Sequence, residues 1–129
     1  MKKAFFTSLV SIVPFVVSFT SSPGTLVGRW QQKIRNGAMM QVNFRPDSSY
    51  NLSINGKYVL GGKYYVKNDT VGITDGGCNI NYYGIYKLNF FAQDSVRWNV
   101  VQDTCAGRRR GYDKGVLGRV KPDMITPSK

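Results

Sequence analysis

Apolar and polar residues alternate in short runs along most of this chain, and from Leu26 onward no run repeats with the period of a helix. Between Tyr50 and Ile54 every second residue is apolar, and the residues between them are polar. Such alternation predicts a β-strand with one buried face. Read in this way, the chain contains eight strands, at residues 26–34, 39–45, 50–54, 58–67, 70–74, 82–91, 95–102 and 112–120.

Turn-forming residues separate the eight runs. Asn55-Gly56 is the strongest hairpin signal, because both positions of a two-residue turn need a positive φ. Pro46-Asp47 and Gln93-Asp94 separate two further pairs of runs. Strands joined by sequential hairpins leave two exposed edges in a flat sheet, and closure into a barrel removes both edges. We therefore predict an all-β fold, a small eight-stranded antiparallel up-and-down barrel, with a two-sheet sandwich as the alternative.

The first residues have a different pattern. Lys2 and Lys3 precede an apolar run of about 16 residues, shorter than the roughly 20 that a membrane-spanning helix needs. Small residues follow this run up to Ser22. That order is typical of a secretory signal peptide. We expect residues 1–22 to be the signal peptide and residues 23–129 to form one lipocalin-like barrel domain with a loose tail at 122–129. A secreted or periplasmic protein is predicted, one that does not span the membrane after cleavage.

Charge and composition restrict the function. The chain has 18 Lys and Arg against 7 acids, all of them Asp, and a net charge of +11, which falls to +9 without Lys2 and Lys3. An excess of this size favours anionic partners, although solubility alone also accounts for it. The chain has no His, the usual general base and the commonest metal ligand. We therefore expect no enzyme, no metal site and no cofactor. No nucleic-acid-binding signature is present either, so nucleic acid is not an expected partner.

Two groups of residues resemble a known family. Gly28-Arg29-Trp30 resembles the Gly-x-Trp opening of lipocalins, in which the Trp packs across the closed end of the barrel. Cys78, Gly84-Ile85-Tyr86 and the segment 103–109, Asp-Thr-Cys-Ala-Gly-Arg-Arg, are similar to the second half of secreted bacterial lipocalin-like domains. The resemblance spans residues 26–120. It implies a calycin-type barrel and, by analogy, binding of a small apolar molecule.

Cys78 and Cys105 are the chain's two cysteines, and we predict that they form a disulfide bond. An oxidising compartment disfavours two free thiols, and a metal site would need more ligands than two sulfurs. A turn centred on Gln93-Asp94 places Cys105 opposite Tyr82, four residues from Cys78. Both cysteines should therefore lie where strands give way to loops.

The candidate ligand-binding residues are three aromatic residues, Tyr64, Tyr86 and Trp98, and the basic run Arg108, Arg109 and Arg110. Aromatic walls suit small molecules, but the same rings would equally well fill the core of a barrel this short. Three guanidiniums in an exposed loop beside the disulfide would grip phosphate or carboxylate groups, or would only keep the protein soluble.

Two functions follow from these readings. The first is an exported, monomeric barrel that binds a small hydrophobic or anionic amphiphilic ligand, with Arg108–Arg110 at its head group. The alternative is a protein-interaction module with a filled barrel, such as a secreted protease inhibitor that uses residues 23–27, or an envelope scaffold. A cavity larger than a few waters would favour the first, and a filled interior the second.

Overall fold

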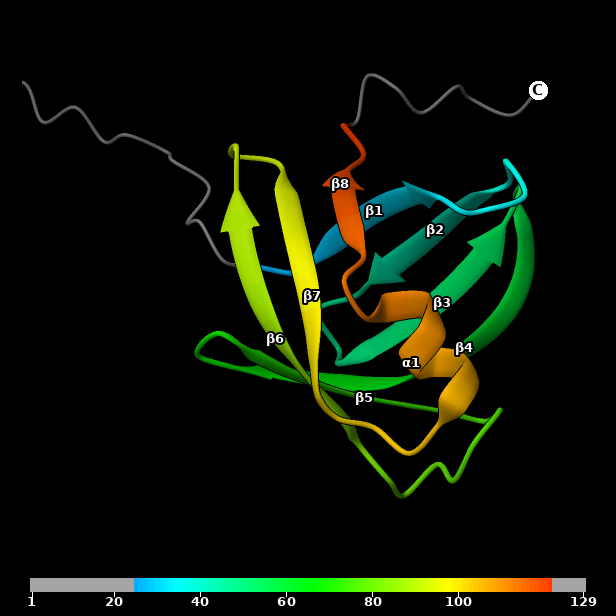
Figure 1. Ribbon diagram of the computed structural model, residues 1–129, viewed down its shortest axis with the longest axis vertical. Helices are drawn as coiled ribbons and strands as arrows, with labels where there is room; N and C mark the ends of the chain where they lie inside the picture. Colours follow the sequence, from blue (N-terminus) through cyan, green and yellow to red (C-terminus); the bar gives the residue numbers. More distant parts are fainter. Residues whose placement is uncertain (1–24, 122–129) are drawn as a thin grey trace, which may run out of the picture.

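The computed structural model describes residues 25–121, and the predicted signal peptide and the tail at 122–129 lie outside these residues. The described chain forms one sheet of eight antiparallel strands that closes on itself, because β1 pairs with both β2 and β8 (Figure 1). The strands are β1 Gly28–Lys33, β2 Met39–Phe44, β3 Ser49–Ile54, β4 Lys57–Lys67, β5 Thr70–Asp75, β6 Gly84–Phe91, β7 Ser95–Gln102 and β8 Val116–Arg119. The predicted up-and-down barrel is confirmed.

Turn chemistry sets the register as expected. Asn55 and Gly56 both have positive φ, at 50° and 81°, and join β3 to β4. Gln93-Asp94 lies in the turn between β6 and β7. In the hairpin that this turn closes, Leu88 of β6 is paired with Trp98 of β7. Consecutive residues of a strand point to opposite faces, so this register puts the apolar side chains inside the barrel.

One helix departs from the prediction. α1, Ala106–Tyr112, occupies the connection between β7 and β8, where the sequence indicated a loop followed by a strand from Tyr112. Seven residues with three consecutive arginines have no apolar period, and so short a helix is stabilised by tertiary contacts rather than by propensity. Two strands also begin later than predicted: β1 begins at Gly28 rather than Leu26, and β6 at Gly84 rather than Tyr82. No helix among the described residues is long and apolar enough to cross a membrane.

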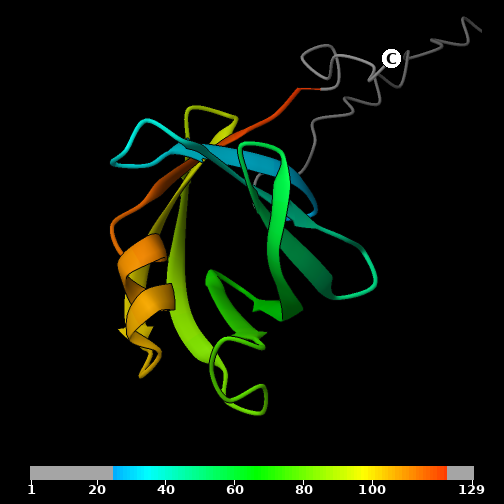
Figure 2. The ribbon, with the colours of Figure 1, turned by 90° about the vertical axis from the view of Figure 1, so that its right-hand side faces the viewer.

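The barrel has two different ends. We call the end that carries the β1–β2, β3–β4 and β5–β6 connections and α1 the open end, and the end with the other three connections the closed end. Figure 2 turns the open end, with α1 and the β1–β2 and β3–β4 turns, toward the viewer. Between the two ends lies a core of buried side chains.

Trp30 seals the closed end. It is fully buried, its indole Nε1 donates to the carbonyl of Leu26 at 2.8 Å, and the guanidinium of Arg119 lies 4.3 Å above its ring. Arg119 also donates to the carbonyls of Val27 and Thr25, at 3.0 and 2.8 Å. These hydrogen bonds fix the segment before β1 across the end of the barrel. They join the end of β8 to the first residues of the described chain.

Candidate ligand-binding site

A pocket of about 930 Å³ lies at the open end. Its apolar lining comes from the inner face of β2 to β4: Met40, Leu52, Ile54, Val59 and Leu60. Besides the buried Arg108, its basic lining comes from the end of β1, the β1–β2 connection, α1 and the residues after α1: Lys33, Arg35, Arg110 and Lys114. All four of these basic residues are exposed and have no salt-bridge partner among the described residues. Two acids also line the pocket: Asp75, which is buried against Arg108, and Asp113, which is half-buried. The pocket therefore joins an apolar wall to a rim whose fully exposed charges are positive.

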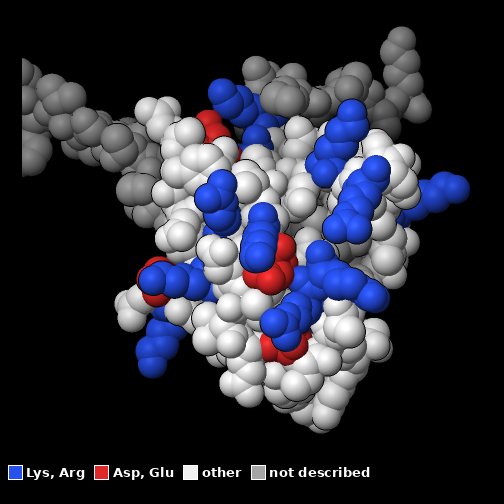
Figure 3. All heavy atoms as spheres, in the orientation of Figure 1, with Lys and Arg blue, Asp and Glu red and all other residues white. Residues whose placement is uncertain are grey.

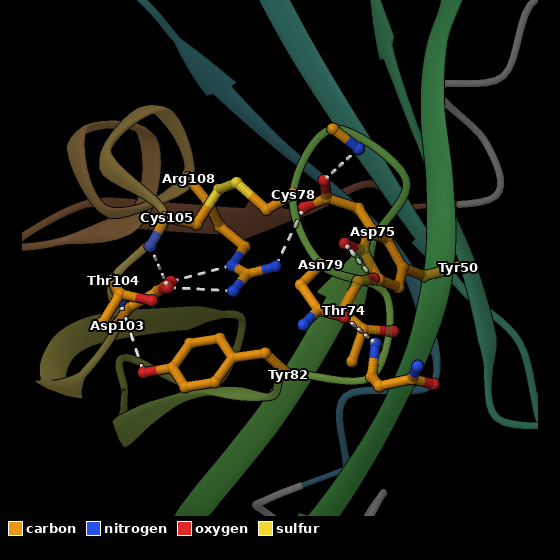
Figure 4. A network of polar contacts seen from close by, with 12 residues as sticks. Tyr50, Thr74, Asp75, Cys78, Asn79, Tyr82, Asp103, Thr104, Cys105 and Arg108 are labelled. Atoms are coloured by element: carbon orange, nitrogen blue, oxygen red, sulfur yellow. Dashed lines mark hydrogen bonds and ion pairs between the residues drawn. A yellow bond between two sulfur atoms is a disulfide. The ribbon is translucent and has the colours of Figure 1, made fainter.

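Beneath the rim, Arg108 is the centre of a buried ion network (Figure 4). Its Nε and Nη2 each donate to one carboxylate oxygen of Asp103 at 2.8 Å, and its Nη1 donates to Asp75 at 3.2 Å. The exposed fractions of the Arg108, Asp103 and Asp75 side chains are 2%, 0% and 5%. A guanidinium so placed is the counter-charge that the two buried carboxylates share.

The remaining bonds of the two carboxylates are also made. Asp103 accepts from the hydroxyl of Tyr86 and, at 2.9 Å, from the backbone N–H of Cys105, and Asp75 accepts from the backbone N–H of Gly77 at 2.9 Å. Burial alone would raise the pKa of Asp103, but the hydrogen bonds from Arg108, Tyr86 and Cys105 outweigh it and lower that pKa. Burial raises the pKa of Tyr86, and its bond to Asp103 raises it further.

This network joins two sequence elements of the chain, Gly84-x-Tyr86 and the segment from Asp103 to Arg108. A side chain at position 84 would place its Cβ 2.3 Å from the Asp103 carboxylate, so the position needs glycine. Two residues later, Tyr86 donates to the same carboxylate. Cys105 and Arg108 donate to it from the other side. The Gly-x-Tyr and Asp-x-Cys-x-Gly-Arg elements are thus two halves of one structural contact.

The predicted disulfide is present. Cys78, in the β5–β6 connection, is bonded to Cys105, with the Cα atoms 6.0 Å apart. Cys105 immediately precedes α1, and both cysteines line the pocket. As expected from the register, they lie where the strands have given way to connections. The bond ties α1 to the opposite wall of the open end.

The structure separates the three aromatic candidates from the pocket. Tyr64, Tyr86 and Trp98 are buried in the core and do not line the pocket. Tyr64 donates to the carbonyl of Arg45 at 2.7 Å and packs edge-on against Phe44, with ring centroids 4.9 Å apart. These three rings therefore fill the core of the barrel, as the packing alternative predicted.

The three arginines are also in different positions. The expectation that Arg108 is exposed is wrong, because its side chain points inward from α1 to the two carboxylates. Arg109 is exposed but does not line the pocket, whereas Arg110 does. Each residue of a helix is rotated about the helix axis relative to the one before it. Three consecutive arginines on a helix must therefore point in three directions.

Sequence reasoning missed Lys33, Arg35 and Lys114 as rim residues. The sequence could have indicated these residues once a barrel was assumed. In an up-and-down barrel, alternate connections lie at the same end, which places the turn near Asn36-Gly37 beside the connection that holds the three arginines. Without α1, however, no residue of that connection could be assigned a direction.

Two buried polar atoms of pocket-lining residues have no hydrogen-bond partner: Oε1 of Gln32 and the hydroxyl of Tyr112. Burial raises the pKa of Tyr112 well above its ordinary value, and its ring stacks on Trp98 with centroids 4.8 Å apart. Among the described residues, Oγ1 of Thr74 and Nε1 of Trp98 are also buried without a partner, although neither residue lines the pocket. The two atoms beside the pocket are groups that a bound molecule could pair with.

Comparisons with known proteins bear on the fold only. No family model matches the chain, and no curated protein matches it. The structure is similar to the NMR structure of a protein from Bacteroides uniformis ATCC 8492, with a TM-score of 0.52 and 16% sequence identity. The match covers 74% of this chain and 89% of that chain. At this identity the two chains share an architecture, and the likeness shows the fold alone.

Proposed function

We propose that this protein is an exported lipocalin-like carrier that binds an anionic amphiphile in the open-end pocket. The observation that carries the proposal is the juxtaposition of the apolar wall with four basic residues that have no salt-bridge partner within residues 25–121. A hydrocarbon tail would lie against Leu52, Ile54 and Leu60, and a carboxylate or phosphate head would lie among Lys33, Arg35 and Arg110. The Cys78–Cys105 disulfide supports export, because such bonds persist in oxidising compartments.

The volume of the open pocket at the barrel mouth supports the carrier function, whereas the filled interior is what the protein-interaction alternative predicts. Small-molecule sites have volumes of about 300–1,000 Å³, and a water occupies about 30 Å³. At about 930 Å³ the pocket exceeds a few waters by a wide margin. The inner part of the barrel, by contrast, is filled by its own aromatic rings. The ligand is therefore expected at the mouth of the barrel and not deep within it.

Laurate titration by isothermal calorimetry tests the proposal, with dodecanol as the uncharged analogue. We expect saturable binding of laurate and weaker binding of dodecanol. Exposed ion pairs contribute roughly 0.2–1 kcal/mol each, so the double variant Arg35→Ala/Arg110→Ala should weaken laurate binding by about two- to thirtyfold. The matched control is Lys67→Ala/Arg97→Ala, two exposed cations outside the pocket, which should leave the affinity unchanged.

Two further variants test the apolar wall. Ile54→Trp fills the pocket, and Val59→Glu places a carboxylate in its wall at a half-exposed position where folding is little affected. Both should abolish laurate binding, with unchanged thermal unfolding for Val59→Glu. No saturable heat with the wild-type protein, or wild-type affinity in both wall variants, would exclude the proposed site.

A further inference from the structure

The two ends of the barrel differ in which of their charged side chains are exposed. Asp47, Asp69 and Asp94 lie in the three closed-end connections. Asp69 lies 3.7 Å from Lys87, and Asp94 lies 3.8 Å from Arg119 and 3.9 Å from Lys121. The closed end therefore carries both signs of charge, and two of its three acids are paired with cations.

The open end carries exposed charge of one sign. Its exposed cations are Lys33, Arg35, Lys57, Arg109, Arg110 and Lys114. Of the acids described there, Asp75 and Asp103 are buried against Arg108. The third, Asp113, is half-buried and accepts the backbone N–H of Val100 at 3.0 Å. Figure 3 views the barrel from the side and not onto the open end, and on the face that it draws Lys and Arg cover far more of the surface than the carboxylates do.

Apolar side chains are exposed among these cations. Tyr58 and Val59 follow Lys57 at the start of β4, with 69% and 50% of their surface exposed, and Val59 also lines the pocket. A soluble polyanion would be held by the cations alone and would give these two side chains nothing to contact. A lipid bilayer offers both an anionic surface and, at headgroup level, an apolar layer in which amphipathic rings such as tyrosine are enriched.

We infer that the open end docks onto an anionic phospholipid bilayer, with Tyr58 and Val59 inserted at headgroup depth and the six cations over the lipid phosphates. This inference deepens the proposed function by naming a membrane as the source of the amphiphile. It rests on the proposed function only for the step in which the lipid enters the pocket. The docking itself does not need an intact pocket, and it can be measured separately.

Co-sedimentation with vesicles tests the docking. The wild-type protein should bind vesicles of phosphatidylcholine with 30% phosphatidylglycerol, should release them in 0.5 M salt, and should not bind pure phosphatidylcholine. Each cation near an anionic surface strengthens binding about fivefold, so Lys57→Glu/Arg109→Glu should weaken it by roughly 25-fold or more. The control, Lys67→Glu/Arg97→Glu, reverses two exposed charges that lie elsewhere and should lose much less.

The same variants separate the docking from the pocket. Lys57 and Arg109 do not line the pocket, so their double variant should lose vesicle binding and keep laurate binding, whereas Ile54→Trp should do the reverse. Equal losses in Lys57→Glu/Arg109→Glu and in the control would overturn the docking orientation. Tyr58→Ser should weaken vesicle binding several-fold, and an unchanged affinity would overturn the assignment to a bilayer, since any polyanion would then suffice.

Discussion

The closed and open ends of this barrel are built from the same hairpins but differ in how completely their polar groups are paired. At the closed end, the Trp30 indole has its acceptor, and Arg119 binds two carbonyls as well as the ring. At the open end, in the part of the chain that the structure describes, Gln32 and Tyr112 keep buried polar atoms without partners, and the four exposed rim cations form no salt bridge. A fully bonded end serves the fold, and an end with unmet bonds is available for binding.

Arg108 is the exception at the open end, and its removal should have the largest effect. Arg108→Met would leave Asp75 and Asp103 buried without a counter-charge, which typically costs about 3–5 kcal/mol. Urea unfolding would measure the loss. Arg110→Met, two residues along α1 and exposed, should change stability by less than about 0.5 kcal/mol. Equal effects of the two substitutions would show that the buried network contributes no more to the free energy of unfolding than an exposed arginine does.

The next largest effect is expected from the disulfide. Cys78 and Cys105 are 27 residues apart, and closing a loop of this size stabilises by roughly 3–4 kcal/mol on the chain-entropy model. Cys78→Ser/Cys105→Ser should lose this stability and should weaken laurate binding, because both residues line the pocket. The wild-type protein under reducing conditions is the matched control and should lose a similar amount. Hydrogen exchange of the Trp30 indole in native buffer should stay slow, because the closed end has its own contacts.

The closed end should respond more mildly. Arg119→Met removes a cation–π contact worth about 0.5–1 kcal/mol and two backbone-directed hydrogen bonds on a side chain that is partly exposed. We expect a loss of about 1–2 kcal/mol in the free energy of unfolding and an unchanged laurate affinity. If laurate binding weakened along with stability, the two ends would be coupled and the comparison between them would fail.

Alternation and turn residues predicted the barrel, because they depend only on neighbours in the sequence. The site could not be read in the same way. The role of Arg108 depends on Asp75, which is 33 positions away and meets it only when the barrel closes. Its direction depends on α1, which has no periodic signal of its own and is held by the disulfide, the ion network and the packing of Tyr112. Arg110 was identified from local density of charge, whereas Lys33 and Arg35 needed the topology.

The smallest expected effect has the opposite sign and tests the unmet bonds directly. The Tyr112 hydroxyl is buried without a partner, so Tyr112→Phe removes a polar group that costs free energy to bury. The variant should be as stable as the wild-type protein or up to about 1 kcal/mol more stable, and should bind laurate a few-fold more weakly. Urea unfolding and calorimetry measure the two quantities.

Tyr50→Phe provides the matched control for this substitution. Tyr50 is also a buried tyrosine, but its hydroxyl donates to the carbonyl of Thr74 at 3.0 Å, so its removal should cost about 1 kcal/mol. It does not line the pocket, and laurate affinity should stay the same. A loss of stability in Tyr112→Phe equal to that in Tyr50→Phe would mean that the Tyr112 hydroxyl is already paired within the protein. The open end would then have no greater need of a ligand at this position than the closed end has.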